Sequence, residues 1–333
     1  MNQKVTLLIT VLMSMISLQA FANFDTSTKI QVDGLYYYLD NDNLQAQVTW
    51  MPDGKYTGNI TIPADITYER KTYSVTNIGE DTFRKCSSLT SVTIPNSVTN
   101  IESGAFYRCS GLTSVIIPNS VTNIESGAFS GCSGLTSIKV ESDNPNYDSR
   151  DNCNAIIQTS INRLYVGCKN TVIPNSVTSI GMDAFGGCSG LTSIIIPNSV
   201  TKIGDDAFKG CTGLVSVTIG NNVTTMGYYV FYECSNLTSV TVLNPTPVSI
   251  SEGYTFTNRK KATLYVPIGS KSAYQAADIW KDFKEIIEID PAKIEQIMND
   301  EKSQATIFTL DGKRIHTPQK GINIIGGKMI LIK

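Results

Sequence analysis

The sequence repeats itself with a period of 23 residues. Residues 89–111 read LTSVTIPNSVTNIESGAFYRCSG, and residues 112–134 read LTSVIIPNSVTNIESGAFSGCSG. Six phenylalanines keep this step in two groups: Phe83, Phe106, Phe129, then Phe185, Phe208 and Phe231. The groups are 56 residues apart, one period plus an excess of 33 residues. One such unit cannot bury its own apolar side, so the period predicts a solenoid of stacked turns.

Each unit begins with a strand pattern and continues into turns. Leu89, Val92 and Ile94 are apolar, and the polar residues Ser91 and Thr93 alternate with the last two, which is typical of a short half-buried strand. The Pro-Asn-Ser step that follows ends the strand. Stacked units would place these strands about 4.8 Å apart in one parallel sheet.

The unit, with its L-x-x-V-x-I opening followed by IPNSVT, AF and GC, resembles the BspA-like leucine-rich-repeat family of exported bacterial surface proteins. Seven units carry the resemblance, which covers most of the chain. It implies a leucine-rich-repeat-like solenoid at residues 76–243. It also implies adhesion to extracellular host or bacterial proteins, matrix and plasma glycoproteins among them.

The N-terminus has the pattern of a secretory signal peptide at residues 1–22. Lys4 precedes an apolar run, and Ala20-Phe21-Ala22 forms a small-x-small cleavage site. The run is shorter than the roughly 20 residues that a membrane span needs, so no transmembrane span is expected. The pattern predicts an exported protein, located outside the cell or on the outer surface of a bacterium.

The solenoid is expected to carry a cap at each end and a hairpin insertion. Residues 23–75 are aperiodic and strand-rich, which predicts a β-rich N-terminal cap. Residues 244–290 predict a β/α C-terminal cap of strand, turn and helix. The apolar stripe of that helix would be Tyr274, Ala277, Trp280, Phe283 and Ile287. Residues 151–170 alternate around a polar centre, which predicts a β-hairpin.

Residues 291–303 are polar and predict a linker, and residues 304–333 predict a small C-terminal β-module. Its TLDGKRI and GKMILIK segments resemble a shortened C-terminal sorting tail of type IX secretion. The resemblance implies a role in export, and an additional β-module without that role is the alternative.

The residue content argues against an enzyme. His316 is the single histidine, which removes most catalytic constellations. No close cysteine pair suits zinc, and no phosphate-binding glycine motif is present, so we expect no metal or cofactor. The formal net charge of −2 and the lack of a basic run argue against nucleic acid as a partner.

Two groups of cysteines have different expected roles. Six keep the repeat step and are expected to be free and buried, because stacked side chains that share one direction suit a disulfide poorly. Cys153 and Cys168 are off the period. They would lie opposite each other if the hairpin turn is centred between Ser160 and Ile161, so a disulfide is predicted there.

Positions that vary between units are the candidate ligand contacts. On the strand face these are Ile116, Lys139 and Ile195, and after the phenylalanines they include Arg84, Tyr107 and Tyr232. Tyrosine and arginine are enriched in protein interfaces. We therefore expect non-catalytic recognition of an extracellular protein through the solenoid surface. The alternative is a glycan-binding accessory protein in carbohydrate uptake, which predicts exposed aromatic residues along one face.

Overall fold

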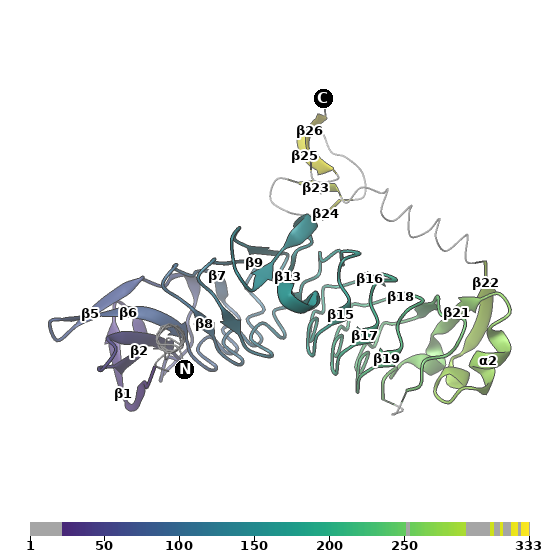
Figure 1. Ribbon diagram of the computed structural model, residues 1–333, viewed down its shortest axis with the longest axis horizontal. Helices are drawn as coiled ribbons and strands as arrows, with labels where there is room; N and C mark the ends of the chain where they lie inside the picture. The colour runs from purple at the N-terminus through teal and green to yellow at the C-terminus, as the bar shows by residue number, and fades with distance from the viewer. Residues whose placement is uncertain are drawn as a thin grey trace, which may run out of the picture.

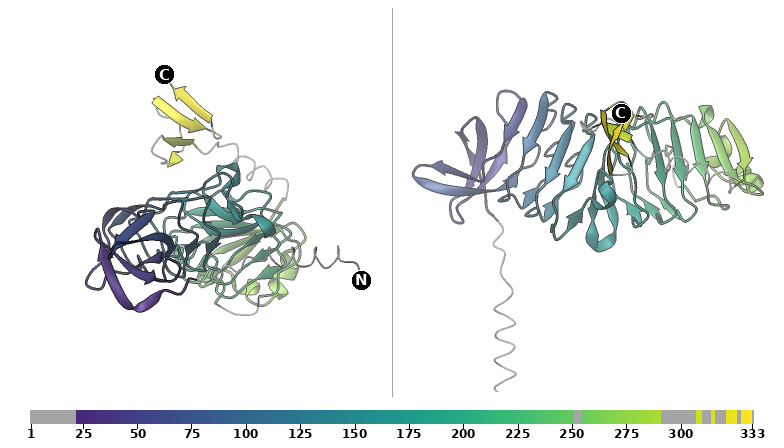
Figure 2. Two further views of the ribbon diagram at one scale, coloured as in Figure 1. Left: turned by 60° about the vertical axis from the view of Figure 1, so that its left-hand side comes forward. Right: turned by 90° about the horizontal axis from the view of Figure 1, so that it is seen from above.

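The protein is an elongated solenoid in the computed structural model, which describes residues 22–250 and 254–290 and the strands of the C-terminal module. The predicted signal peptide, apart from Ala22, and the predicted linker lie outside the described residues. Successive turns stack along the long axis between a cap at each end (Figures 1 and 2).

One column of parallel strands follows the predicted L-x-x-V-x-I segments. Lys139 pairs with Ile116, and Thr218 pairs with both Ile195 and Thr241, so neighbouring turns align one period apart. The strands of this column are β4 (Gly58–Thr61), β7 (Leu89–Thr93), β9 (Ser114–Ile117), β11 (Ser137–Val140), β16 (Ser193–Ile196), β18 (Ser216–Ile219), β20 (Ser239–Val242), β21 (Thr263–Pro267) and β22 (Glu285–Ile289).

A second parallel column lies on another side of the turn, whereas the sequence predicted one sheet. Most of its strands are two residues long, which is too short to produce an alternating pattern. They are β6 (Lys71–Ile78), β8 (Asn100–Ile101), β10 (Asn123–Ile124), β14 (Arg163–Gly167), β15 (Ser179–Ile180), β17 (Lys202–Ile203) and β19 (Thr225–Met226).

The N-terminal cap is an antiparallel sheet joined to the second column. Strands β1 (Asp25–Val32), β2 (Leu35–Asp40) and β3 (Gln45–Thr49) pair in order, and β3 pairs in parallel with β6. Strand β5 (Asp65–Tyr68) pairs antiparallel with β6. Because β4 already pairs with β7, regular stacking begins before residue 76.

The core is a column of stacked phenylalanine rings. Neighbouring centroids from Phe83 to Phe129 are 5.1 and 5.0 Å apart, and those from Phe185 to Phe256 are 4.8, 5.1 and 5.0 Å apart. These rings are almost completely buried. Stacked turns thus bury the apolar side that one turn cannot bury alone.

The excess residues form an insertion between the two groups of turns. It contains β12 (Tyr147–Asp148), the short 3-10 segments η1 (Arg150–Asn152) and η2 (Thr159–Ile161), and the antiparallel hairpin of β13 (Ala155–Gln158) with β14. Gly167 lies at the place of a phenylalanine in this turn. A Cβ there would come within 2.2 Å of the Phe185 ring.

The predicted disulfide is not formed, and Cys153 and Cys168 are both free and buried. Ile157 pairs with Leu164, but Ile156 pairs with Val166, so a bulge shifts the hairpin register by one residue. Continued outward, the shifted register brings Cys153 opposite Lys169 rather than Cys168. The six repeat cysteines are also free and buried.

The C-terminal cap contains less helix than predicted. Helix α2 (Lys271–Ala276) is followed by the short 3-10 segment η4 (Trp280–Asp282) and then by strand β22. The predicted helix was expected to continue through these residues. Ala277 is extended, with a φ of −85° and a ψ of 133°, so the helix ends there, before Ile279 with its φ of 69°. Tyr274, Trp280 and Phe283 are buried as predicted, but Ile286 is buried in place of Ile287. The remaining 3-10 segment, η3 (Arg259–Lys261), precedes β21.

The C-terminal module contains four antiparallel strands in the order β24-β23-β25-β26. They are β23 (Ile307–Thr309), β24 (Arg314–Ile315), β25 (Gly321–Ile325) and β26 (Lys328–Ile332).

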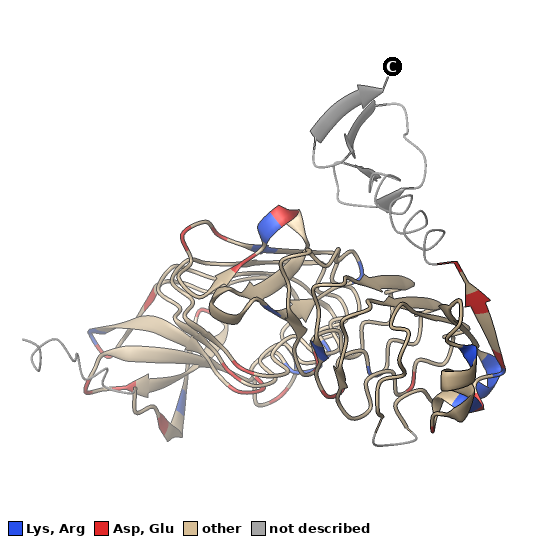
Figure 3. Cartoon of the chain, turned by 45° about the vertical axis from the view of Figure 1, so that its right-hand side comes forward, with Lys and Arg blue, Asp and Glu red and all other residues tan. Residues whose placement is uncertain are grey.

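Within the described residues, no helix has the length and apolarity to cross a membrane. Acidic and basic residues are scattered over the described turns, and several basic residues gather near the C-terminal cap (Figure 3).

Candidate functional site

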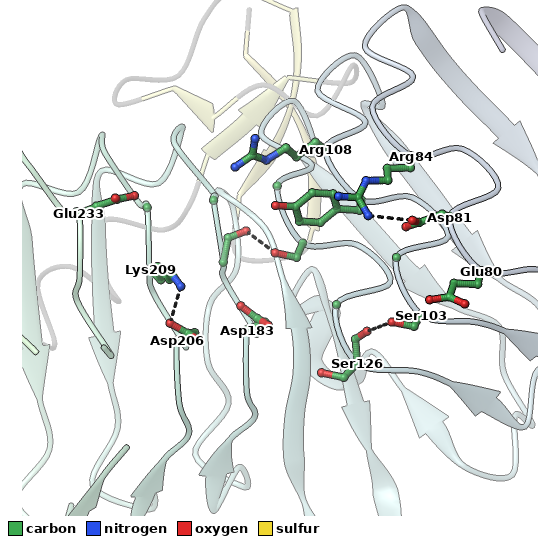
Figure 4. A pocket seen from close by; sticks show the side chains of 18 residues that line it. Glu80, Asp81, Arg84, Ser103, Arg108, Ser126, Asp183, Asp206, Lys209 and Glu233 are labelled. Atoms are coloured by element: carbon green, nitrogen blue, oxygen red, sulfur yellow. Dashed lines mark hydrogen bonds and ion pairs between the residues drawn. The ribbon is translucent and has the colours of Figure 1, made fainter. Parts of the chain in front are cut away.

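A hollow of about 530 Å³ crosses six turns of the solenoid (Figure 4). It is lined by the residues just before and just after the phenylalanine position of each turn. We call it the edge groove. Its lining residues are Glu80, Asp81, Arg84, Ser103, Gly104, Tyr107, Arg108, Ser126, Gly127, Ser130, Gly131, Asp183, Gly186, Gly187, Asp206, Lys209, Gly210 and Glu233.

Two left-handed backbone positions in each turn shape this edge. They stand two residues before and two residues after the phenylalanine, as Asp206 and Gly210 do around Phe208, with φ values of 54° and 69°. Glycine and aspartate adopt this region most readily. The acidic pair Asp205 and Asp206 belongs to this turn.

The groove is hollow because the inserted turn is missing from this edge. Gly131 N–H donates to the Gly186 carbonyl at 2.7 Å, as Arg108 N–H donates to the Ser130 carbonyl at 2.8 Å in consecutive turns. Nearer the core, however, Gly167 N–H donates to the Ala184 carbonyl, so the inserted turn is present there. The inserted turn is thus present near the core and absent at the edge.

Glycines allow the two halves to meet at the floor of the groove. A Cβ on Gly187 would come within 2.8 Å of the Gly131 Cα. Real side chains do not tolerate such an approach to backbone, so this junction requires glycine. The middle of the edge groove is therefore backbone, and its larger side chains come from the turns on both sides.

In the N-terminal half of the groove, acidic and basic side chains lie around one tyrosine, Tyr107. Arg84 Nη1 lies 2.7 Å from Asp81 Oδ2. The Arg84 and Arg108 guanidinium carbons lie 5.0 and 5.2 Å from the Tyr107 ring centroid. Both distances suit cation–π contacts. Glu80 and Asp81 thus face two arginines in this half.

The C-terminal half of the groove is acidic, with Asp183, Asp206 and Glu233 against Lys209. Lys209 Nζ lies 3.0 Å from Asp206 Oδ1. Burial, and secondarily the neighbouring Asp206 charge, raise the pKa of the Asp183 carboxyl. These carboxylates are therefore only partly neutralised within the groove.

A tyrosine cluster of Tyr229, Tyr232 and Tyr254 continues the line of turns beyond this half. The Tyr229 and Tyr254 rings stack at 5.9 Å between centroids, and Tyr232 meets them edge-on at 5.4 and 6.2 Å. Lys209 Nζ lies 5.7 Å from the Tyr229 centroid. Tyr254 is 58% exposed, so it presents aromatic surface to solvent.

The predicted contact residues divide between this edge and the strand face. Arg84 and Tyr107 line the edge groove, and Tyr232 belongs to the tyrosine cluster. On the strand face, Ile116 and Lys139 are paired neighbours, and Ile116 is 52% exposed. Ile195 lies on β16, beyond the insertion, so the structure does not bring the three strand-face candidates together.

Lys139 also lines a separate hollow of about 440 Å³ between β11 and the insertion. Sequence reasoning did not select Asp183 or Asp206 as site residues. The available signal was their fixed offset from the phenylalanine, at the positions that the structure shows to be left-handed.

The described residues hold no group of three or more histidine, cysteine or acidic side chains suited to a metal ion. Burial also raises the pKa of the Cys188 and Cys234 thiols to about 12, so these two groups remain neutral thiols near neutral pH. What the arrangement offers is a long surface of paired charges and aromatic rings.

The fold is that of a leucine-rich-repeat solenoid in which two short-strand columns carry a grooved edge. The profile of the BspA type leucine rich repeat region matches six copies in residues 59–166 and 157–277. The chain therefore belongs to the BspA type leucine-rich-repeat family. No curated protein matches the sequence.

Several solved structures resemble the chain. A leucine rich cell surface protein from Faecalibacterium prausnitzii A2-165 is 21% identical over 81% of this chain and 97% of its own, with a TM-score of 0.47. The pneumococcal vaccine antigen PcpA is 17% identical over 79% of this chain and 99% of its own, with a TM-score of 0.36. A leucine-rich repeat protein from Bacteroides ovatus ATCC 8483 is 21% identical over 78% and 82%, with a TM-score of 0.31.

Proposed function

We propose that this protein is exported by a bacterium and binds an extracellular protein, without catalysis, through the edge groove. A matrix or plasma glycoprotein, or a protein on another cell surface, is the partner class that we propose. The single observation that carries this proposal is the groove itself, which crosses six turns and gathers charged and aromatic side chains on a glycine floor.

The dimensions of the groove support a polypeptide ligand. Six turns at about 4.8 Å spacing extend over roughly 24 Å, which matches about seven residues of extended chain. The arginine and tyrosine side chains of its N-terminal half are of the types enriched at interface hot spots. The signal-peptide pattern of residues 1–22 supports an extracellular partner.

The test is a binding screen of the mature chain, beginning at Asn23, against matrix proteins, plasma proteins and glycan arrays. For the protein that binds, Gly127→Asn tests the groove. Gly127 has a φ of 71° and open space around a Cβ, so asparagine should be accommodated while its side chain intrudes on the groove. We expect binding to weaken at least tenfold.

The matched control is Gly34→Asn in the N-terminal cap, where φ is 82° and a Cβ also meets open space. It should leave binding unchanged. A second comparison replaces Ile116, Lys139 and Ile195 together with serine. If that triple variant loses binding while Gly127→Asn does not, the strand face is the binding surface. If only a glycan is retained on the arrays, the carbohydrate alternative replaces the protein partner.

A further inference from the structure

Within the tyrosine cluster, Tyr229 occupies a position where the preceding regular turns hold aspartate or glycine. Two residues before the phenylalanine, the preceding turns have aspartate or glycine, whereas the next turn has Tyr229 with a φ of 55°. This conformation is disfavoured for a bulky side chain and, where it persists, marks a site that the surrounding structure maintains. Here it places the Tyr229 ring against Tyr254 and Tyr232.

Two aromatic rings on this edge already have cations over them, Tyr107 outside the cluster and Tyr229 within it. Arg84 and Arg108 lie 5.0 and 5.2 Å from the Tyr107 centroid, and Lys209 lies 5.7 Å from the Tyr229 centroid. No such cation lies over Tyr232 or Tyr254 among the residues that the structure describes. Tyr254 is 58% exposed, so it has aromatic surface available to a ligand.

The charges beside the cluster indicate the sign of that ligand. Glu233 follows Tyr232 directly, is exposed, and lines the end of the edge groove. No ion pair of Glu233 is present within the described part of the chain, and Lys209, the nearby cation, pairs with Asp206. Figure 4 shows Glu233 and Asp206 toward the end of the groove away from Arg84. Aromatic surface beside unneutralised carboxylate is complementary to a cation.

We propose that the C-terminal end of the edge groove, formed by Glu233 and the tyrosine cluster, binds an arginine side chain of the protein partner. The guanidinium group would stack on tyrosine and donate hydrogen bonds to the Glu233 carboxylate. Arginine suits both contacts, because its planar group stacks on aromatic rings and donates in a fork that matches a carboxylate. This inference names a chemical feature of the partner and therefore rests on the proposed function.

The chemistry can be tested before the partner is known, with the mature full-length protein and labelled glycine-serine peptides. The peptides carry paired arginines, paired lysines or paired citrullines, the last being an uncharged isostere of arginine. Fluorescence anisotropy at low salt should show binding of the arginine peptide. The citrulline peptide should bind at least tenfold more weakly, and the lysine peptide about threefold more weakly.

Two substitutions locate the site. Tyr254→Leu and Glu233→Gln should each weaken binding of the arginine peptide about fivefold to tenfold. Their controls are Tyr228→Leu and Glu285→Gln. Tyr228 is 49% exposed and takes part in no ring contact among the described residues, and Glu285 is an exposed acid on β22. Both controls should bind as the wild type does.

Three results would each overturn the inference. The arginine peptide could fail to bind, or it could bind no more tightly than the citrulline peptide. The control variants could also lose as much binding of the arginine peptide as Tyr254→Leu and Glu233→Gln do. These results are separable from the proposed function. If an extracellular protein binds and Gly127→Asn weakens it, but Tyr254→Leu and Glu233→Gln have no effect, the inference fails and the proposed function stands. If the arginine peptide binds as predicted but no extracellular protein does, the proposed function fails and the arginine site stands.

Discussion

Each regular turn carries a phenylalanine and, three residues later, a cysteine, and four of these six cysteines bond to the preceding turn. Cys109 Sγ donates to the Phe83 carbonyl at 2.9 Å, and Cys211 Sγ donates to the Phe185 carbonyl at 3.1 Å. Cys132 and Cys234 repeat this contact. A buried thiol is small and apolar but retains a weak donor, which suits a position between two tightly stacked turns.

Phe208→Ala should destabilise the fold far more than Lys209→Ala. Phe208 stacks on both Phe185 and Phe231, so its removal leaves a cavity that costs about 3–5 kcal/mol. Lys209 forms a partly exposed ion pair with Asp206, which contributes about 1 kcal/mol or less. Urea unfolding of both variants measures the difference, and equal free energies of unfolding would contradict the assigned stacking.

All eight cysteines should be free thiols. Cys153 and Cys168 are buried and face different parts of the core, because the hairpin register is shifted by one residue. Alkylation in urea without a reductant, followed by mass spectrometry, should therefore label every cysteine. A Cys153–Cys168 linked peptide would show that the register in solution differs from that described here.

Stability should fall as the pH rises above about 9. Burial raises the pKa of the Cys86 thiol from 9.0 to about 11 and that of Cys188 to about 12. Below pH 9 these thiols are protonated in both states, so their contribution is fully present. Between about 9 and 12 the unfolded state loses protons that the folded state retains, which lowers the free energy of unfolding. Urea midpoints at about pH 8 and about pH 10.5 should differ in this direction, and equal midpoints would contradict it.

At the scale of elements, the insertion determines how the two groups of turns meet. Its strand β14 joins the second column, and Gly167 leaves room for the Phe185 ring. At the edge, by contrast, Gly131 bonds directly to Gly186. The extra turn near the core and the direct contact at the edge are therefore two sides of one irregularity in an otherwise uniform stack.

Gly167→Ala should destabilise the protein by about 1–3 kcal/mol, because the new methyl group would overpack against Phe185. Phe185→Leu removes part of the obstructing ring. The double variant should thus lose less stability than the two single losses added together. Strict additivity in chemical denaturation would show that the two side chains do not meet.

The sequence pattern was sufficient for the elements that repeat. The first strand column and the buried phenylalanines follow from apolar spacing, which recurs at a fixed step. The second column could not be predicted, because strands as short as Asn100–Ile101 have no measurable alternation. The helix expected near Trp280 was wrong, because the apolar stripe does not encode the extended conformation of Ala277, where the helix ends.

At the scale of the whole molecule, the candidate site depends on a contact that no local pattern contains. Arg84 and Tyr107 could be selected from their variable repeat positions. That they share a groove with Asp183 and Lys209 follows only from the junction of Gly131 with Gly186 across the insertion. Repetition thus made the scaffold predictable, and the interruption of the repeat made the site unpredictable.

Hydrogen–deuterium exchange of the mature protein, with and without a bound extracellular protein, tests the central claim most directly. We predict new protection in the segments that line the edge groove, around residues 81–85, 104–108, 183–187 and 206–210, with little change in strands β9, β11 and β16. Protection confined to those three strands, with an unchanged edge, would contradict the assignment of the edge groove as the recognition surface.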